Sequence, residues 1–368
     1  MGDPAGVGPE LLVRSIHSRA TFSSSQLLLI ACPELLQKAA ALHGMARLPL
    51  TEIVWQETSP DSFRSQITSA LEQQLIPCCN PTRSGTGSIP PRVVSGAAGD
   101  AAYRCLSLAT DLALSRHIDA IVTAPLNKEA LHLAGHHYPG HTEILAERCG
   151  VAEFAMMLHL PDTALAPLRQ LLLPHMPPAA LPSRHGLSIA HVTLHTSVAS
   201  VPGLLTTDSI AAAIRLMDHF LKSSGCLRRS IAVCALNPHG GEHGLFGDEE
   251  ARVIAPAIAP FAGLLNIQGP LPADTAIRRA VLGEFDGVIA MYHDQGHIPV
   301  KLIGFDAAIN ITLGLPIIRT SPTHGTAFDI AWQPNASLNA AGIIGAIRMA
   351  ERLATAGAHD RLGCVQNR

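Results

Sequence analysis

The sequence predicts an α/β protein with two domains built around mainly parallel sheets. Short apolar runs typical of buried strands alternate along the chain with helical stretches, and this alternation favours right-handed crossovers between parallel strands. At 368 residues the chain is too long for one ordinary small core. With 47% hydrophobic and 15% charged residues it has the composition of a folded globular protein without compositional signs of disorder.

The predicted strands are short apolar runs bounded by polar residues, glycine or proline. They cover Gln26–Ala31, Asp119–Ala124, Phe154–Leu158, Ser188–Leu194, Ser230–Leu236 and Gly287–Met291. The predicted helices have helical spacing of apolar residues, and they cover Pro33–Gly44, Asp100–His117, Asp208–Leu221, Asp248–Ala259 and Asn339–Ala356. In addition, Gly135–Gly150 is predicted to be a histidine-rich turn that runs into a helix.

Other segments give weaker patterns. Residues Pro77–Gly99 are rich in Pro, Gly and Ser and predict a long irregular connection. No regular element is predicted for Leu160–Gly186, which contains seven prolines or glycines. The apolar runs within Met291–Thr326 resemble buried strands, and this glycine-punctuated segment carries more site-type side chains than any other.

Charge and composition argue against several classes of protein. The net charge is −3 and no run of Lys or Arg is present, so nucleic acid is a poor candidate partner. Every apolar stretch is shorter than the roughly 18 residues that a membrane span needs, and the first residues lack the features of a secretion signal. The eight cysteines include no C-x-x-C spacing and are expected to be reduced. We therefore expect a cytoplasmic location.

Three of the nineteen histidines closely follow predicted strands: His195, His239 and His293. In an open α/β fold ligands gather at the carboxyl ends of parallel strands, so these side chains could converge. Three neutral imidazoles leave coordination positions free for substrate, as a catalytic metal requires. The alternative is that they are unrelated loop histidines.

His239 and His243 formally match H-x-x-E-H, a metalloprotease pattern that works only on a helix. Pro238, Gly240 and Gly241 favour a loop instead. A metal hydrolase is therefore a remote alternative.

Several residues are candidates for binding an anionic group. Gly135–Thr142 nearly matches a P-loop, with His141 in place of the lysine, so that His141 and Thr142 at a helix start could bind a carboxylate or phosphate. The alternative is helix capping by Thr142 with Glu143 in the first turn. The Gly2–Glu10 loop is either a similar anion site or a tight turn.

Lys301, Asn310 and Arg319 stand beside apolar runs and together suit carboxylate and phosphate, although each alone is typical of a solvated strand end. Asp294, His297 and His324 are neighbours without an assigned role.

The motifs GDPAGVGPE, VTAPLNK, PGHTE, LNPHGGE, GPLPADT, YHDQGHIPVK and NITLGLPIIRTSPTHGTA occur in this order over nearly the whole chain. This pattern resembles the 4-hydroxythreonine-4-phosphate dehydrogenases of pyridoxal phosphate biosynthesis. The resemblance implies a fold of two α/β/α domains like the isocitrate and isopropylmalate dehydrogenases. We expect residues 1–130 plus about 305–368 in the first domain, and residues 131–304, with the metal ligands and dimer contacts, in the second.

The resemblance also implies a homodimer with shared active sites in interdomain clefts, NAD or NADP, and one divalent metal, Zn, Mg or Co. The family's metal ligands fall on His195, His239 and His293, and its substrate contacts on His141, Thr142, Lys301, Asn310 and Arg319. Asp274 is a candidate proton-transfer group or partner of a ligand, and the residues that contact the dinucleotide are not identified. The implied reaction oxidises 4-phosphooxy-L-threonine to a β-keto acid, which decarboxylates to 3-amino-2-oxopropyl phosphate.

Some features depart from the family pattern. The apolar strand expected before GDPAG is absent, so we expect either a misassigned start at Met1 or a first sheet that lacks a strand. Thr323 replaces the usual aspartate, and Leu160–Gly186 is longer than usual. The DQGHIPVK and HVTLHTS segments resemble a branch that acts on D-threonate or D-erythronate 4-phosphate, which is the alternative substrate class.

Overall fold

The computed structural model describes residues 1–18, 25–56, 59–173, 175, 185–334 and 336–356. These residues form two compact units. Unit 1 comprises Met1–Gly150 and Arg319–Glu351, and unit 2 comprises Val151–Ile318 together with the described residues from Arg352 onward. All three histidines predicted as metal ligands belong to unit 2, because its range includes positions 195, 239 and 293.

Unit 1 contains a parallel sheet of three short strands in the order β1-β3-β2. A further strand, β4, lies beside β11, where the Thr123 amide donates to the Thr320 carbonyl. The strands are β1 (Leu29–Ile30), β2 (Leu50–Ile53), β3 (Ile76–Cys79), β4 (Ala120–Val122) and β11 (Ile318–Pro322). The helices are α1 (Gly8–His17), α2 (Pro33–Leu42), α3 (Pro60–Glu72), α4 (Gly96–Leu114), α5 (Lys128–Leu133), α6 (His141–Cys149) and the start of α13 (Ala341–Thr355), with a 3-10 turn η2 (Thr86–Ser88).

The glycine-rich loop before α1 is tied to its surroundings through its own amide groups. The carboxylate of Asp3 accepts from the Ala5 amide at 2.8 Å, and the Val7 amide donates to the Thr326 carbonyl at 3.0 Å. The amides of Asp3 and Gly6 also donate within the protein. These N–H groups are not available to an anion, which supports the tight-turn interpretation of this loop.

Unit 2 contains strands in the order β10-β5-β6-β9-β7-β8. The strands β6, β9, β7 and β8 pair in parallel, whereas β5 is antiparallel to both of its neighbours, β10 and β6. Their bounds are β5 (Ala155–Leu160), β6 (Leu187–His191), β7 (Ile231–Cys234), β8 (Ile267–Leu271), β9 (Gly287–Ala290) and β10 (Ile309–Leu313). The prediction of an α/β protein with mainly parallel sheet is therefore confirmed.

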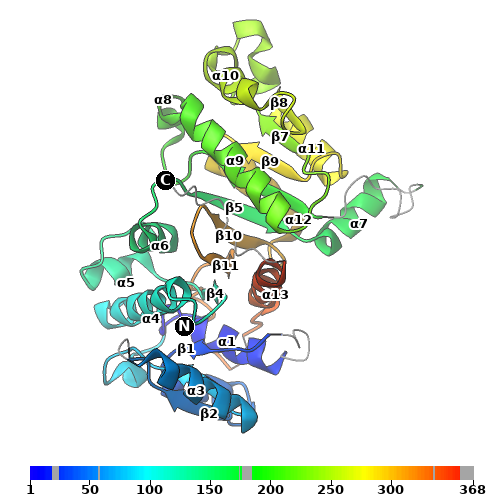
Figure 1. Cartoon of the computed structure of the whole chain (residues 1–368). Helices are drawn as coiled ribbons and strands as arrows, with labels where there is room; N and C mark the ends of the chain where they lie inside the picture. The colour runs from blue at the N-terminus through cyan, green and yellow to red at the C-terminus, as the bar shows by residue number, and fades with distance from the viewer. Residues whose placement is uncertain (19–24, 57–58, 174, 176–184, 335, 357–368) are drawn as a thin grey trace. The chain divides into compact units, whose positions relative to one another are not determined.

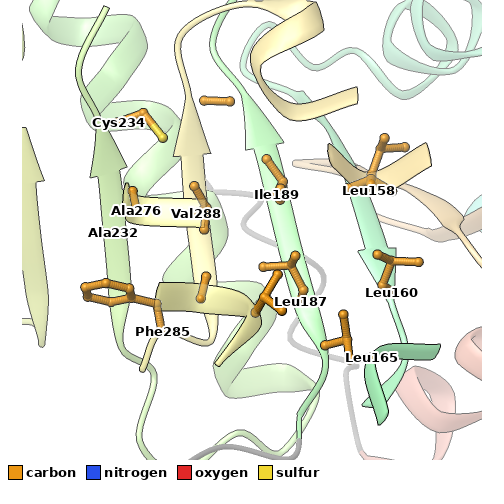
Figure 2. Packing of buried hydrophobic residues seen from close by; sticks show 14 of the residues in the cluster. Leu158, Leu160, Leu165, Leu187, Ile189, Ala232, Cys234, Ala276, Phe285 and Val288 are labelled. Atoms are coloured by element: carbon orange, nitrogen blue, oxygen red, sulfur yellow. The ribbon is translucent and has the colours of Figure 1, made fainter. Parts of the chain in front are cut away.

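Helices cover both faces of this sheet (Figure 1). The helices described in unit 2 are α7 (Asp162–Leu172), α8 (Val201–Leu204), α9 (Thr207–Ser223), α10 (Ala255–Ile258), α11 (Ala273–Val281) and α12 (His293–Gly304), with shorter turns η4 (Val198–Ser200), η5 (Pro238–Gly244), η6 (Glu250–Ile254) and η7 (Ala259–Phe261). Figure 2 shows the apolar cluster on one face, where Ile189, Val288 and Ala232 lie on neighbouring strands. On the other face α9 packs so closely that a Cβ at Gly287 would lie 2.7 Å from the Met217 sulfur.

Most predicted elements are present at their expected places, with ends shifted by a few residues. Three predictions are wrong. Residues Ile298–Ile303 belong to helix α12 and are not a strand, α7 occupies part of Leu160–Gly186, and β3 lies within the predicted irregular segment after Pro77. Each of these elements contains a proline, which disfavours a regular helix or strand: Pro167 in α7, Pro299 in α12 and Pro77 in β3. The rest of Leu160–Gly186 lies partly outside the described residues.

Within the described part of the chain, none of the helices combines the length and the apolar character required to cross a bilayer. None of the seven cysteines that the structure describes forms a disulfide bond.

Unit 2 also contains a buried pair of histidines remote from the candidate ligands. His159 is 3.0 Å from the hydroxyl of Ser188, and His185 lies 3.3 Å from the Arg352 guanidinium. Burial, with repulsion from the neighbouring His185 and Arg352, lowers the pKa of His159 to about 3. Burial and Arg352 lower the pKa of His185 to about 4.

These histidines predict acid sensitivity. An unfolded histidine has a pKa of about 6.5, so between roughly pH 6.5 and the folded values the unfolded chain binds protons that the folded chain does not. The free energy of unfolding should therefore fall as the pH falls through this window. His159→Gln should reduce the slope by up to about 1.4 kcal/mol per pH unit. Urea unfolding with chelator present at pH 7.5, 6.5, 5.5 and 4.5 measures this slope. An unchanged slope in the variant would contradict the assignment.

Candidate active site

The three predicted metal ligands follow three neighbouring parallel strands. Strands β6, β9 and β7 lie side by side in that order, so their carboxyl ends meet at the same edge of the sheet. His195 comes four residues after the end of β6, His293 begins α12 after β9, and His239 lies in η5 after β7. The strand arrangement on which the prediction depended is therefore present.

The loop after β6 is bonded to the end of β9. The hydroxyl of Thr193 donates to the Met291 carbonyl at 2.8 Å, and the Val192 amide donates to Ala290 at 2.9 Å. As a result, the rings of His195 and His293 lie side by side, with centroids 5.7 Å apart and planes at 43°.

A cavity of about 350 Å³ opens beside these two histidines. It is lined by Leu194, His195, Thr196, Ser197, Val198, Val201, Tyr292, His293 and Asp294. The lining combines two imidazoles with hydroxyl groups and one carboxylate, so a small polar ligand suits it better than an apolar one.

Asp294 orients the imidazole of His293. Its carboxylate lies 2.6 Å from His293 Nδ1, and this hydrogen bond lowers the pKa of Asp294. Because a carboxylate only accepts, Nδ1 of His293 carries the proton and Nε2 keeps its lone pair. A carboxylate on the far nitrogen is the usual arrangement behind a metal-binding histidine.

His239 lies in a segment with an unusual backbone. All five residues from His239 to His243 have φ values between 46° and 81°, in the left-handed region. The segment is therefore not the right-handed helix that an H-x-x-E-H metal site requires, and the predicted loop is confirmed. Left-handed conformations cost non-glycine residues roughly 1–2 kcal/mol each, so neighbouring contacts must hold the loop in place.

Two buried side chains supply such contacts, and the sequence did not single out either. Glu250 accepts the amides of Leu236 and Asn237, both at 2.8 Å, at the start of the loop. Gln295 accepts the Met291 amide at 2.7 Å and donates to the Ala235 carbonyl at 2.8 Å, so it joins the ends of β9 and β7. The only signal for Gln295 was its position between His293 and His297, and Glu250 gave none because burial of a carboxylate is not visible in a sequence.

The structure thus brings His195 and His293 together and places His239 on the adjacent strand end. Among the described residues there is no group of three or more His, Cys, Asp or Glu side chains that could hold a metal ion as they stand. The three-histidine ligand set remains a prediction.

In unit 1, His141 and Arg319 are close enough to interact. Arg319 on β11 is only 1% exposed, and its Nη2 donates to the Thr123 hydroxyl at 2.7 Å. Burial lowers the pKa of Arg319 to about 10, so the side chain remains a cation. Burial and the charge of Arg319 hold the pKa of His141 well below its usual value. The start of α6 therefore combines a fixed positive charge with a neutral imidazole.

The alternative interpretation, in which the Thr142 side chain caps a helix, is wrong. Helix α6 begins at His141 with Gly140 as its N-cap, and no side chain caps it. Thr142 is the second helical residue and is buried, so the first amides of α6 are not capped by a hydroxyl.

The remaining candidates are placed separately. Lys301 is exposed on α12, and Asp274 is exposed in the first turn of α11. Asn310 lies on β10, where its buried Oδ1 has no hydrogen-bond partner among the described residues. This orphaned acceptor is available to a donor on a ligand. In His324, Nδ1 lies 3.1 Å from the Gly325 carbonyl.

The loop backbone gives a testable prediction. Gly240 and Gly241 both have left-handed φ, but a Cβ at Gly240 would meet nothing within 4 Å, whereas one at Gly241 would lie 2.7 Å from the Glu250 carboxylate. Gly240→Ala should cost about 1 kcal/mol of stability and Gly241→Ala roughly 1–3 kcal/mol more. Urea unfolding of the two variants measures the difference, and equal losses would show that Gly241 does not approach Glu250 this closely.

Comparison with known proteins identifies the family of this chain. The family model described as pyridoxal phosphate biosynthetic protein PdxA matches residues 23–350. A D-threonate 4-phosphate dehydrogenase from Salmonella typhimurium is 40% identical over 355 residues, covering 96% of this chain and 97% of the relative. A 4-hydroxythreonine-4-phosphate dehydrogenase from Geobacter metallireducens is 39% identical over 358 residues, covering 96% and 94%.

Among solved structures, the 4-hydroxythreonine-4-phosphate dehydrogenase from Klebsiella pneumoniae has a TM-score of 0.74 at 38% identity, covering 96% of this chain and 98% of that one. The resemblance noted in the motifs is thereby confirmed over most of the sequence. The chain belongs to the PdxA family of pyridoxal phosphate biosynthetic proteins.

Proposed function

We propose that this chain is an NAD(P)-dependent, divalent-metal-dependent dehydrogenase that oxidises the secondary alcohol of a four-carbon hydroxy acid 4-phosphate. The observation that carries the proposal is the placement of His195, His239 and His293 after three adjacent parallel strands, with His195 and His293 side by side. The family's dehydrogenases supply the reaction class.

The donor set fits a divalent metal. His293 presents Nε2 because Asp294 accepts from its Nδ1, and neutral imidazoles suit Zn and Co, while substrate oxygens could complete a site for Mg. When bound, such a metal would polarise the substrate alcohol and stabilise the alkoxide formed as hydride passes to the nicotinamide.

The other candidates take roles that match their surroundings. In unit 1, Arg319, His141 and Thr142 at the uncapped start of α6 would bind phosphate or carboxylate. In unit 2, Lys301 would add a positive charge, and the free Oδ1 of Asn310 would accept from a substrate hydroxyl. The oxidised product is a β-keto acid, which loses CO2 readily. Asp274 remains a candidate for proton transfer.

Between the two substrate classes, D-threonate 4-phosphate is favoured over 4-phosphooxy-L-threonine. The two differ at C2, where the first carries a hydroxyl and the second an ammonium group. The cavity beside His195 offers hydroxyl groups from Thr196, Ser197 and Tyr292, which suit the C2 hydroxyl of D-threonate 4-phosphate. The HVTLHTS and DQGHIPVK segments, which resemble the D-threonate branch, support the same choice.

We also propose a homodimer in the cytoplasm. Large apolar side chains are exposed on the segments next to His195 and His239, including Val198 at 71%, Leu245 at 73% and Phe246 at 49%. Exposed apolar groups around a polar site are typical of a surface that a second subunit covers. The seven described cysteines form no disulfide bond, which supports a reducing compartment.

The substrate proposal is tested by following NAD(P)H formation at 340 nm. With Co²⁺, Zn²⁺ or Mg²⁺ present, D-threonate 4-phosphate should be oxidised with a kcat/KM at least about tenfold above that for 4-phosphooxy-L-threonine, since the loss of one matched polar contact costs about 1–3 kcal/mol. Chelator should abolish turnover. A higher kcat/KM for 4-phosphooxy-L-threonine would reverse the substrate choice, and no turnover of either would remove the dehydrogenase proposal.

The ligand assignment predicts a loss of metal binding. His293→Ala removes one of the proposed ligands, so its Co²⁺ affinity and its turnover should both fall by at least about 100-fold, while the circular dichroism spectrum stays that of the parent. His159→Gln is the comparison variant, because His159 belongs to a separate buried pair of histidines and its loss should leave the Co²⁺ affinity unchanged. Undiminished Co²⁺ binding in His293→Ala would show that His293 is not a ligand.

A further inference from the structure

Two more histidines lie directly behind His293 and have no role so far. His191 is the last residue of β6 and is 2% exposed, and His297 lies one turn after His293 on α12 and is 7% exposed. Nε2 of His191 is 3.1 Å from Nδ1 of His297, and their ring centroids are 4.7 Å apart. They come from the HVTLHTS and DQGHIPVK segments, which the structure therefore joins in one contact.

The hydrogen bonds fix which nitrogens carry protons. Nδ1 of His191 lies 3.2 Å from the Met156 carbonyl, which can only accept, so this nitrogen is the donor. Nε2 of His191 is then an acceptor, and Nδ1 of His297 must donate to it. The same Nδ1 is 3.1 Å from the His293 carbonyl and can share its proton with that oxygen. Burial favours the neutral form of both rings, lowering the pKa of His191 to about 4 and that of His297 to about 3.

His297 in turn packs flat against His293. The two ring centroids are 3.6 Å apart and the planes differ by 12°. Residues four apart on a helix lie on the same face, which makes this stacking possible. On another side, His293 faces His195. The plane of the His293 ring is therefore set by His297, and its rotation within that plane is restrained by Asp294.

Helix α12 reaches this position only because residue 296 is glycine. A Cβ at Gly296 would lie 2.4 Å from Nε2 of His191 and 2.8 Å from a methyl carbon of Ile189. Any side chain there would separate α12 from β6 and pull His297 away from its partner.

We propose that His191 and His297 are positioning residues that hold the ring of His293 in the orientation from which Nε2 binds the divalent metal. His191 acts through His297, and His297 acts through the stacked ring. The inference rests on the proposed ligand role of His293. Residues that hydrogen-bond to or pack against a metal ligand commonly contribute about 10–100-fold to metal affinity. Burying two imidazole rings costs desolvation free energy that two apolar side chains would not cost, so a stable core alone does not explain this pair.

The experiment measures Co²⁺ dissociation constants on chelator-stripped protein by competition with a chromophoric chelator, together with the visible Co²⁺ spectrum. His297→Leu removes the stacked ring and should weaken Co²⁺ about 10–100-fold and alter the spectrum. His297→Phe keeps a ring against His293 and should recover most of the affinity. His191→Phe should weaken Co²⁺ by a smaller factor. The double variant His191→Phe, His297→Leu should bind no more weakly than His297→Leu alone, because the two act in series.

His159→Leu is the matched control. His159 is also a buried histidine of this sheet with a side-chain partner, Ser188, so its loss should lower stability while the Co²⁺ dissociation constant stays within about twofold of the parent.

The outcomes separate this inference from the ligand proposal on which it rests. If His293→Ala binds Co²⁺ like the parent, His293 is not a ligand and the inference falls with it. If His293→Ala loses Co²⁺ while folded His297→Leu and His191→Phe keep the parent affinity and spectrum, only the positioning role is overturned. If His297→Leu does not fold, the single variants His297→Phe and His191→Phe and their double variant are compared instead. If the losses of Co²⁺ affinity in the two single variants add up in the double variant, His191 does not act through His297.

Discussion

The parallel pairing of β6, β9 and β7 is the constraint on which the candidate site depends. These strands place three histidines at one edge of a sheet, although they lie far apart in the sequence. The pairing continues beyond the strands through the bond from Thr193 to Met291, and Gln295 joins the ends of β9 and β7. Because the side chains of Thr193 and Gln295 bond to backbone groups at the strand ends, the segments that carry the candidate ligands are tied to the sheet.

Sequence patterns were sufficient for the buried parallel strands, because both faces of each are covered and the apolar runs are nearly continuous. They failed where proline occurs inside a regular element, as at Pro167 in α7 and Pro299 in α12. Local propensity disfavours proline there, but burial of apolar side chains such as Leu165 and Val300 outweighs it.

The histidines near the candidate site show the same limit. The positions after the strands identified His195, His239 and His293, because topology alone brings them to one edge. No pattern could show that His191 and His297 touch, since this contact depends on how closely α12 approaches β6. Likewise, the left-handed turn at His239 depends on Glu250, whose burial is a property of the folded chain. Side chains that act through other side chains are the ones that sequence reasoning misses.

The order of β6, β9 and β7 also bears on when a metal can be acquired. Each strand that precedes a candidate ligand is separated from the next in the chain by a helix or more, so no two of these histidines are near one another before the sheet has formed. Contacts of this long range form late in folding, after the entropy of closing the intervening loops has been overcome. A metal that needs all three imidazoles would therefore stabilise the finished protein without guiding its folding.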